Sequence, residues 1–404
     1  MTIIAVPVFL RVMKLSSRID SISPDGADGW ELFRKARDMA ASGLPVIQLT
    51  LGEHDIRTDP AILAALHDAA KAGHTGYPSI PGTLALRQAI ATRIAARTGV
   101  PTTPDNILVT AGGQAGLFMA HHAACDAGDV ALFIDPYYAT YPGTIRTVGA
   151  VPRAIRVHPE DGFQPKGAAI DAAAAGAKSL LVNSPNNPTG IVYSRATLEQ
   201  IARVCIARDL WLISDEVYDT QVWAGEHLSP RALPGMAERT LVIGSMSKSH
   251  AMTGSRIGWI CGPTDAIGPL WDLDTNTNYG IPGYIQDAAL FALNLGPDFE
   301  AAIAAPFKRR RAITQSILAG QNLIQAAPMG GAMYVMLDVR PTGLTGAEFA
   351  TRLLDTHLIA VMPGDSFGQA TAGHVRVAMT VADDIYAAAL TRILGFAQEL
   401  ASQG

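Results

Sequence analysis

The most constraining feature of this sequence is a regular alternation of short apolar runs and amphipathic stretches between about residues 55 and 265. The strand-like runs cover residues 106–110, 130–135, 179–185, 210–216, 240–245 and 257–262. Stretches between them, such as RATLEQIARVCIARD at 195–209, have the apolar spacing of surface helices. Strands that are apolar throughout are typical of a parallel sheet covered by helices on both faces. We therefore expect an α/β fold.

Beyond about residue 295 the pattern changes to a long helix, two strands with a helix between them, and a final helix. This succession is typical of a smaller α+β domain. A chain of 404 residues is also too long for one compact core. We predict an N-terminal arm with part of the small domain at 1–50, a large domain at 51–294 and a C-terminal small domain at 295–404.

The charge of the chain argues against nucleic acid as a partner. The net charge is −5, and the one basic cluster, FKRRRA at 307–312, lies in a helical pattern and is interpreted as a solvated face. The sequence has no helix-turn-helix pattern before its core. The apolar opening, residues 1–14, is interrupted by Pro7 and Arg11 and is too short to cross a bilayer, so we expect a flexible arm and no membrane.

The cysteines indicate the compartment. Cys125, Cys205 and Cys261 are far apart and odd in number, which favours reduced thiols and a cytoplasmic location. The sequence contains no CxxC or HExxH spacing, so we expect no metal site.

Polar residues follow several of the predicted strands. Ligands of open parallel sheets bind at the carboxyl ends of the strands, so these residues form a candidate site. They are Gly112, Gly113, Gln114, Tyr137, Tyr138, Asn187, Asp215, Tyr218, Ser245, Ser247 and Lys248.

Two chemistries fit this set incompletely. NILVTAGGQAG at 106–116, with Asp135 ending the next strand, resembles a dinucleotide-binding turn of an NAD-dependent dehydrogenase, but Ala111 stands where its first glycine belongs. Ser245 and Lys248 match the S-x-x-K pattern of serine acyl transfer, but the S-D-N and K-T-G elements of that family are missing.

Lys248 favours a third chemistry, in which its amine forms a Schiff base with the aldehyde of pyridoxal phosphate (PLP). This cofactor needs an acid at its pyridine nitrogen, partners for its ring hydroxyl, a stacking face and phosphate donors. Asp215 is the candidate acid, Asn187 and Tyr218 are candidates for the ring hydroxyl, and Tyr138 for the stacking face. The candidate phosphate donors are the backbone of Gly113 and Gln114, the hydroxyls of Ser245 and Ser247, and the Arg256 guanidinium.

Three motifs extend this interpretation to a family. NSPNNPTG at 183–190, SDEVY at 214–218 and SMSKSHAMTGSRIGW at 245–259 resemble, in the same order, motifs of the class I/II PLP-dependent aminotransferases of fold type I. The resemblance runs from LGEHD at 51–55 to HVRVAM at 374–379. It implies a large domain with a mainly parallel seven-stranded sheet between helices, and a smaller α+β domain.

The resemblance also implies an activity and further site residues. It implies ping-pong transfer of an amino group from an L-amino acid to a 2-oxo acid such as pyruvate or 2-oxoglutarate, with Lys248 as the residue that moves the proton. Arg376 would bind the substrate α-carboxylate, assisted by Gly52 and Asn187. Tyr77 would reach the phosphate of the neighbouring subunit, so the resemblance implies a homodimer with shared active sites.

The substrate is less constrained. Stretches such as SKSHAMTG at 247–254 resemble transaminases that use arginine and pyruvate, and a guanidinium substrate would favour a carboxylate at the pocket mouth. Candidate carboxylates are Asp28, Glu53 and Asp55. An aspartate or aromatic aminotransferase is the alternative, although aspartate-active relatives often have a lysine where Gln114 stands. His54 also replaces the proline that is usual in the family.

Overall fold

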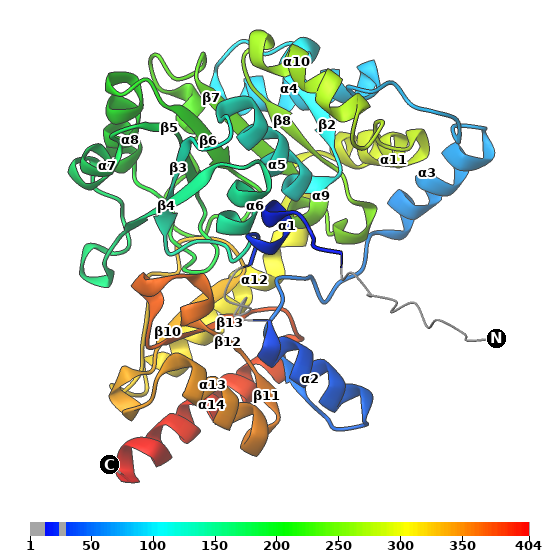
Figure 1. Ribbon diagram of the computed structural model, residues 1–404. Helices are drawn as coiled ribbons and strands as arrows, with labels where there is room; N and C mark the ends of the chain where they lie inside the picture. The colour runs from blue at the N-terminus through cyan, green and yellow to red at the C-terminus, as the bar shows by residue number, and fades with distance from the viewer. Residues whose placement is uncertain (1–12, 24–29, 404) are drawn as a thin grey trace, which may run out of the picture.

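The computed structural model describes residues 13–23 and 30–403, and its central element is a seven-stranded sheet (Figure 1). The strands are β2 (Ile107–Thr110), β3 (Val130–Asp135), β4 (Val151–Arg156), β5 (Ala177–Asn183), β6 (Trp211–Asp215), β7 (Thr240–Ser245) and β8 (Gly258–Cys261). Their order is β2-β8-β7-β6-β5-β3-β4, and β8 runs antiparallel to both of its neighbours while the other pairs are parallel. The mainly parallel sheet of an α/β fold is therefore confirmed.

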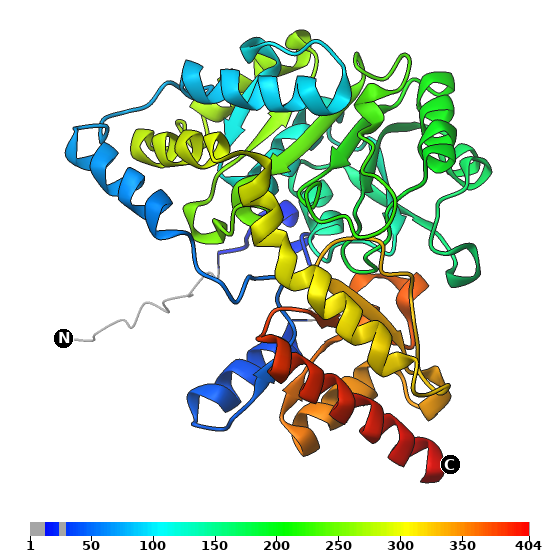
Figure 2. The same ribbon diagram turned by 180° about the vertical axis from the view of Figure 1, so that it is seen from behind.

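Helices cover both faces of this sheet (Figures 1 and 2). One face carries α5 (Gly112–Ala124), α6 (Tyr141–Thr147) and α10 (Thr264–Thr275), and the other carries α3 (Pro60–Lys71), α4 (Leu84–Thr98), α7 (Gly167–Ala173), α8 (Arg195–Ala207) and α11 (Gly283–Asn294). Neighbouring residues of one strand enter opposite cores. In β2, Leu108 lies in the core of α5, while Ile107 and Val109 lie in the core of α4. Burial on both sides explains why these strands are apolar runs without alternation.

Strand β4 is missing from the predicted runs. It lies at the edge of the sheet, and Ile155 is its one buried residue. An edge strand with one buried side chain has no continuous apolar run, so the sequence signal on which the other strands were predicted does not arise there.

A second group of elements combines both ends of the chain (Figure 2). Its elements are α2 (Glu31–Ala41), β1 (Ile47–Gln48), α12 (Gly296–Leu318), β9 (Gln325–Ala326), β10 (Tyr334–Asp338), α13 (Gly346–His357), β11 (Ile359–Ala360), β12 (Met362–Pro363), β13 (His374–Ala378) and α14 (Asp383–Gln403). An antiparallel sheet of order β12-β13-β10-β9 and the parallel pair β1-β11 share one apolar core with these helices. The domain boundaries at residues 50 and 294 stay a prediction.

The basic cluster FKRRRA of α12 is a solvated face only in part: Lys308 and Arg309 are exposed, but Arg310 is buried. The Arg310 side chain is 3% exposed and bonds Asp55 through two nitrogens, at 2.6 and 2.9 Å, and Asp383 at 2.8 Å. Phe307 of the same turn is buried in the core. The interpretation failed for Arg310 because both of its acidic partners are distant in sequence.

Some expectations fall outside the described residues, namely the arm at 1–12 and the candidate carboxylate Asp28. Within the described part of the chain, no single helix is long and apolar enough to cross a membrane. Helices α11 and α12 meet that test only when they are counted together across a bend of 92°.

Candidate active site

A cavity of about 300 Å³ lies at the carboxyl ends of the central strands. Its lining includes Gly52, Gly113, Gln114, Tyr138, Asn187, Asp215, Tyr218, Ser245, Ser247, Lys248, Arg256 and Arg376. Of the residues that the sequence predicts for the cofactor or the substrate carboxylate, Gly112, Tyr137 and Tyr77 do not line this cavity. The segments come from far apart in the chain and meet because parallel strands end at the same edge of the sheet.

Lys248 lies in the short helix α9 (Met246–Ser249), directly after β7. The Ser245 hydroxyl caps this turn by accepting from the Ser247 N–H at 3.1 Å. The Lys248 ammonium donates to the Gly52 carbonyl. Burial, with the charges of Arg376 and Arg256, lowers the pKa of Lys248 to about 8, against the opposing charges of Glu53 and Asp215.

Asp215 is the last residue of β6 and is buried. Its carboxylate accepts from the Tyr141 hydroxyl at 2.7 Å and from the Val217 N–H at 3.3 Å. Burial raises the pKa of Asp215 to about 6 despite these two bonds. Tyr141 was not predicted as a site residue, although it follows the tyrosine pair at 137–138 by one helical turn.

Two tyrosines and an amide form a hydroxyl cluster beside Asp215. The hydroxyls of Tyr218 and Tyr334 lie 2.8 Å apart, and the Asn187 amide donates to the Tyr334 hydroxyl at 3.4 Å. Burial raises the pKa of both tyrosines, so both hydroxyls are neutral donors. The sequence analysis missed Tyr334, because within the strand-like run at 332–339 it has the pattern of a core residue.

Arg376 of β13 is almost fully buried, at 2% exposure, and has no carboxylate partner among the described residues. Its guanidinium donates to the Asn187 side-chain oxygen at 2.7 Å and to the Thr50 carbonyl. It lies between the rings of Tyr334 and Phe367, with its central carbon 4.4 and 4.3 Å from their centroids. Its Nε is buried without a hydrogen-bond partner in the described residues. Burial lowers the pKa of this arginine.

The amino end of α5 and Arg256 form a cradle of donors at another side of the cavity. Gly112 begins α5 with φ of +77°, and a Cβ there would lie 2.5 Å from the Arg256 guanidinium. Arg256, itself at φ of +49°, donates to the carbonyls of Thr253 and Ala111 and forms no ion pair with a described residue. Free helix N–H groups beside an unpaired cation are suited to an anion.

The structure shows the contacts of three further residues that the sequence predicts for the site. The Gln114 side chain bonds Thr144 at 2.7 Å and Thr140 at 3.0 Å, which leaves its backbone to face the cradle. Tyr138 lines the cavity and packs edge-on against Tyr141, with centroids 5.8 Å apart. Tyr77 is 91% exposed and does not line the cavity of its own chain.

The two described candidate carboxylates for a cationic substrate differ in whether they line the cavity. Glu53 lines the cavity with Lys248 and accepts from the Thr253 hydroxyl at 3.0 Å. Asp55 is bound to Arg310 and does not line it, so the structure argues against this candidate. His54 packs edge-on against Phe307, and both of its ring nitrogens lack a partner among the described residues.

Asp135 argues against the dinucleotide interpretation. Its carboxylate accepts from the backbone N–H groups of Gln369 and Ala370 at 3.0 and 3.1 Å. It therefore joins β3 to the segment before β13 and does not line the active-site cavity.

Comparison with known proteins identifies the class of the protein. The sequence profile of the family "Aminotransferase class I and II" matches residues 45–393. The chain therefore belongs to this family of PLP-dependent transaminases, which use an amino acid and an oxo acid as substrates.

Individual relatives sharpen this assignment. The chain is 38% identical to arginine–pyruvate transaminase of Pseudomonas aeruginosa over 97% of this chain and 100% of that protein. It is 34% identical to aspartate/prephenate aminotransferase of Thermus thermophilus over 94% and 97% of the two chains. A double mutant of Thermus thermophilus aspartate aminotransferase has a similar structure, with a TM-score of 0.89 at 33% identity, covering 95% of this chain and 100% of that one.

The charges around the cavity fit PLP. Lys248, Arg256 and Arg376 supply three cationic groups, whereas Asp215 and Glu53 supply two carboxylates. A phosphate at the α5 cradle and a substrate carboxylate would give Arg256 and Arg376 the anionic partners that no described residue supplies. Asp215 would hold a proton on the pyridine nitrogen, where a cation would offset the burial of its carboxylate.

Proposed function

We propose that this transaminase transfers an amino group by a ping-pong reaction in which Lys248 moves the proton. When bound, PLP supplies an aldehyde and a ring that takes up the electrons of the broken Cα–H bond. The lowered pKa of Lys248, about 8, supports a role for its amine in accepting a proton near neutral pH. The observation that carries the proposal is the convergence of Lys248, Asp215 and Arg376 on one cavity.

The other residues of the cavity orient the reactants. Tyr218 and Asn187 would hydrogen-bond the ring hydroxyl, and Tyr138 would stack on the ring. The backbone of Gly113 and Gln114, the hydroxyls of Ser245 and Ser247, and Arg256 would bind the phosphate. Arg376 would bind the substrate carboxylate through its guanidinium, with the Gly52 backbone and Asn187 beside it.

For the amino donor, we propose a substrate with a cationic side chain, arginine first, and pyruvate as acceptor. The support is the 38% identity to the Pseudomonas aeruginosa arginine–pyruvate transaminase, together with the Glu53 carboxylate in the cavity. A dicarboxylic donor is the second candidate, because the Thermus thermophilus aspartate/prephenate aminotransferase is 34% identical and the cavity has an excess of cations.

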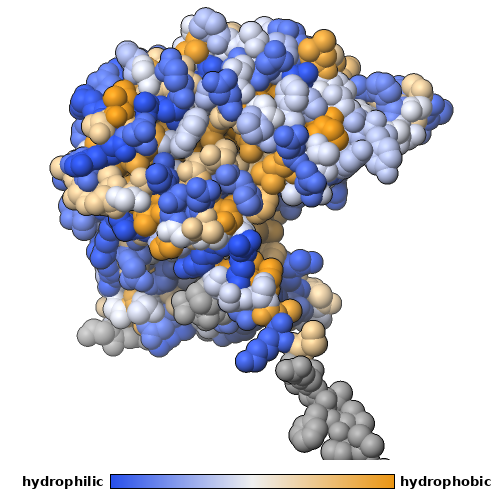
Figure 3. Space-filling view, turned by 45° about the horizontal axis from the view of Figure 1, so that its top comes forward, coloured by the Kyte–Doolittle hydropathy of each residue, from blue (hydrophilic) through white to orange (hydrophobic). Residues whose placement is uncertain are grey.

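We further propose a homodimer in which Tyr77 reaches the partner's phosphate site. Tyr77 packs against Tyr279, with centroids 5.1 Å apart, and both rings are exposed. A larger hollow of about 890 Å³ adjoins the active-site cavity through Gln114 and Arg256, on a surface where apolar and hydrophilic residues are interspersed (Figure 3). An exposed aromatic pair and an open hollow beside the site support a subunit interface. The three free, buried cysteines support a cytoplasmic location.

Borohydride reduction of the PLP-loaded protein, followed by peptide mapping, tests the site. We expect the label on Lys248; a label on another lysine would refute its assignment. A panel of amino donors against pyruvate and 2-oxoglutarate, read as the oxo acids formed, tests the substrate. Faster turnover of aspartate than of arginine and lysine would favour the second candidate.

A further inference from the structure

The turn that carries Asp215 and Tyr218 has a second face. Asp215, Val217 and Tyr218 line the active-site cavity, whereas Glu216 and Asp219 line a separate cavity of about 270 Å³. The Asp219 N–H donates to the Glu216 carbonyl at 3.0 Å, and the Gln221 N–H donates to the Tyr218 carbonyl at 2.8 Å. Residues 215–221 are thus a compact turn with Asp215 and Tyr218 on the cavity side and Glu216 and Asp219 on the other.

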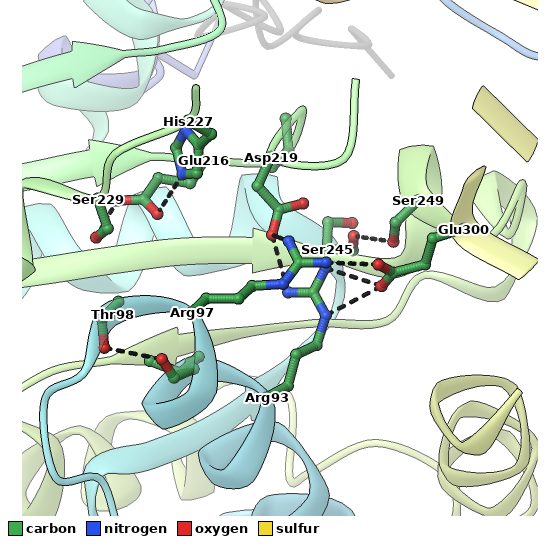
Figure 4. Close-up of polar contacts among 12 residues, drawn as sticks. Arg93, Arg97, Thr98, Glu216, Asp219, His227, Ser229, Ser245, Ser249 and Glu300 are labelled. Atoms are coloured by element: carbon green, nitrogen blue, oxygen red, sulfur yellow. Dashed lines mark hydrogen bonds and ion pairs between the residues drawn. The ribbon is translucent and has the colours of Figure 1, made fainter. Parts of the chain in front are cut away.

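The acids of this second face are held by a charged layer (Figure 4). Arg93 and Arg97, from α4, both bond Asp219, at 2.8 and 2.7 Å. The same arginines bond Glu300 of α12, at 2.9 and 2.5 Å. Two cations therefore face two carboxylates, and each arginine bridges both acids.

Glu216 is held separately, next to this layer. Its carboxylate accepts from the Ser229 hydroxyl at 2.7 Å and lies 3.0 Å from the His227 ring (Figure 4). It also accepts from the Ser214 hydroxyl at 2.8 Å. Burial alone would lower the pKa of His227, but Glu216 raises it. Both acids of the turn are thereby fixed on the side opposite the cavity.

The layer is buried enough to hold its geometry. The side chains of Arg93, Asp219 and Glu300 are 13%, 14% and 9% exposed. Burial alone would raise the pKa of Asp219, but Arg93 and Arg97 lower it to about 2. Asp219 is the member of this network that belongs to the turn, so its removal leaves Arg93 and Arg97 without full charge compensation and breaks the bonds between the turn and α4.

Helix α12 extends the layer to the lysine turn. Phe299 of α12 stacks on His250, two residues after Lys248, with centroids 5.7 Å apart. The next residue, Glu300, is the one that bonds Arg93 and Arg97. The amino end of α12 therefore contacts the supports of both the lysine turn and the Asp215–Tyr218 turn.

We propose that Asp219 is a positioning residue: its bonds to Arg93 and Arg97 hold the turn in place and so fix the Tyr218 hydroxyl against the cofactor ring. The inference rests on the proposed role of Tyr218. Asp219 is the next residue in the chain, so its Cα lies one peptide unit, about 3.8 Å, from that of Tyr218. Glu300 has no such covalent link to the turn, although it belongs to the same charged layer.

This difference provides a matched pair of variants, Asp219→Asn and Glu300→Gln. Each replaces one carboxylate of the layer by an amide of the same shape. We expect Asp219→Asn to lower kcat roughly tenfold or more, with KM for the amino donor little changed, because a small displacement near the reacting groups is costly. It should also shift the pH at which the absorbance of bound PLP changes. Glu300→Gln should lower the melting temperature without either effect.

A double-mutant cycle tests whether Asp219 acts through Tyr218. In a Tyr218→Phe background, adding Asp219→Asn should change kcat and the absorbance titration by less than about twofold, since the group being positioned is gone. Undiminished effects in that background, or equal effects of Glu300→Gln, would refute the proposal. If Asp219→Asn does not fold, Arg97→Gln replaces it, because Arg97 is 35% exposed. Lys248→Ala, assayed in parallel, separates failure of the proposed function from failure of this inference.

Discussion

The two faces of the turn after β6 carry charge in different balance, and the cations on the cavity side range from the buried Arg376 to the exposed Arg256. On the cavity side, Lys248, Arg256 and Arg376 outnumber the carboxylates and bond mainly to carbonyls and amides. On the other side, each of two arginines meets two carboxylates. Since an unpaired buried charge is costly, the folded chain tolerates it where a ligand compensates it. Balanced charge therefore marks the scaffold, and unbalanced charge marks the site.

The largest effect is expected on the unbalanced side, from Lys248→Ala. Loss of the amine should slow the half-reaction of PLP-loaded protein with an amino acid by on the order of a thousandfold or more, because the proton then has no acceptor in place. Single-turnover absorbance measures this. The exposed Lys178→Ala is the control and should match the wild type. A fast Lys248→Ala half-reaction would remove the lysine from the mechanism.

Asp215 should destabilise the PLP-free protein as pH rises. Its pKa is raised from 3.8 to about 6, so the folded state binds more protons than the unfolded state between these values. The stability that this carboxyl contributes is greatest below about pH 4 and falls by about 3 kcal/mol as pH rises past 6. The side chain of Asp215→Asn does not titrate. Urea unfolding should therefore show the free energy of unfolding of the wild type falling relative to that of Asp215→Asn as the pH rises over this range. Parallel pH profiles would contradict the raised pKa.

Arg376→Met should separate binding from stability. We expect KM to rise on the order of a hundredfold for every amino donor, because truncating a buried charged partner of a carboxylate is costly. The melting temperature of the PLP-free variant should fall less than that of Asp219→Asn, since the substitution removes a cation that lacks an acidic partner. A KM effect confined to one donor would contradict recognition of the α-carboxylate.

The smallest effect is expected from the titration of Asp219. It changes the free energy of unfolding with pH in the direction opposite to that of Asp215. The pKa of Asp219 is lowered from 3.8 to about 2, so the unfolded state binds more protons between these values. The stability that Asp219 contributes is present above about pH 4, and about 2 kcal/mol is lost as pH falls towards 2. Denaturation at pH 5 and pH 3 should show the wild type losing about 1 kcal/mol of its stability advantage over Asp219→Asn, with Glu300→Gln as the comparison.

The sequence predicts the unbalanced face better than the balanced one. Asp215 and Lys248 end or follow apolar strands, and the rule that parallel strands end at one edge brings them together without further information. The sequence analysis did not predict Tyr141 and Tyr334 as site residues, because a tyrosine among apolar residues has the pattern of an ordinary core residue. The charged layer was not predicted either, because Arg93 is 126 residues from Asp219 and 207 residues from Glu300. No local sequence pattern indicates pairs so far apart.

Helix α12 contacts both the core around the C-terminal strands and the supports of the active-site turns. It has 23 residues, which corresponds to a rod of about 35 Å. Near its amino end, Phe299 stacks on His250 of the lysine turn, and Glu300 bonds Arg93 behind the Asp215–Tyr218 turn. Farther along, Arg310 bonds Asp55. Asp55 is three residues from Gly52, whose carbonyl accepts from Lys248. Pro306 lies inside the helix between these contacts, so any change of bend at this residue would alter the spacing between the supports on the two sides of the reactive amine.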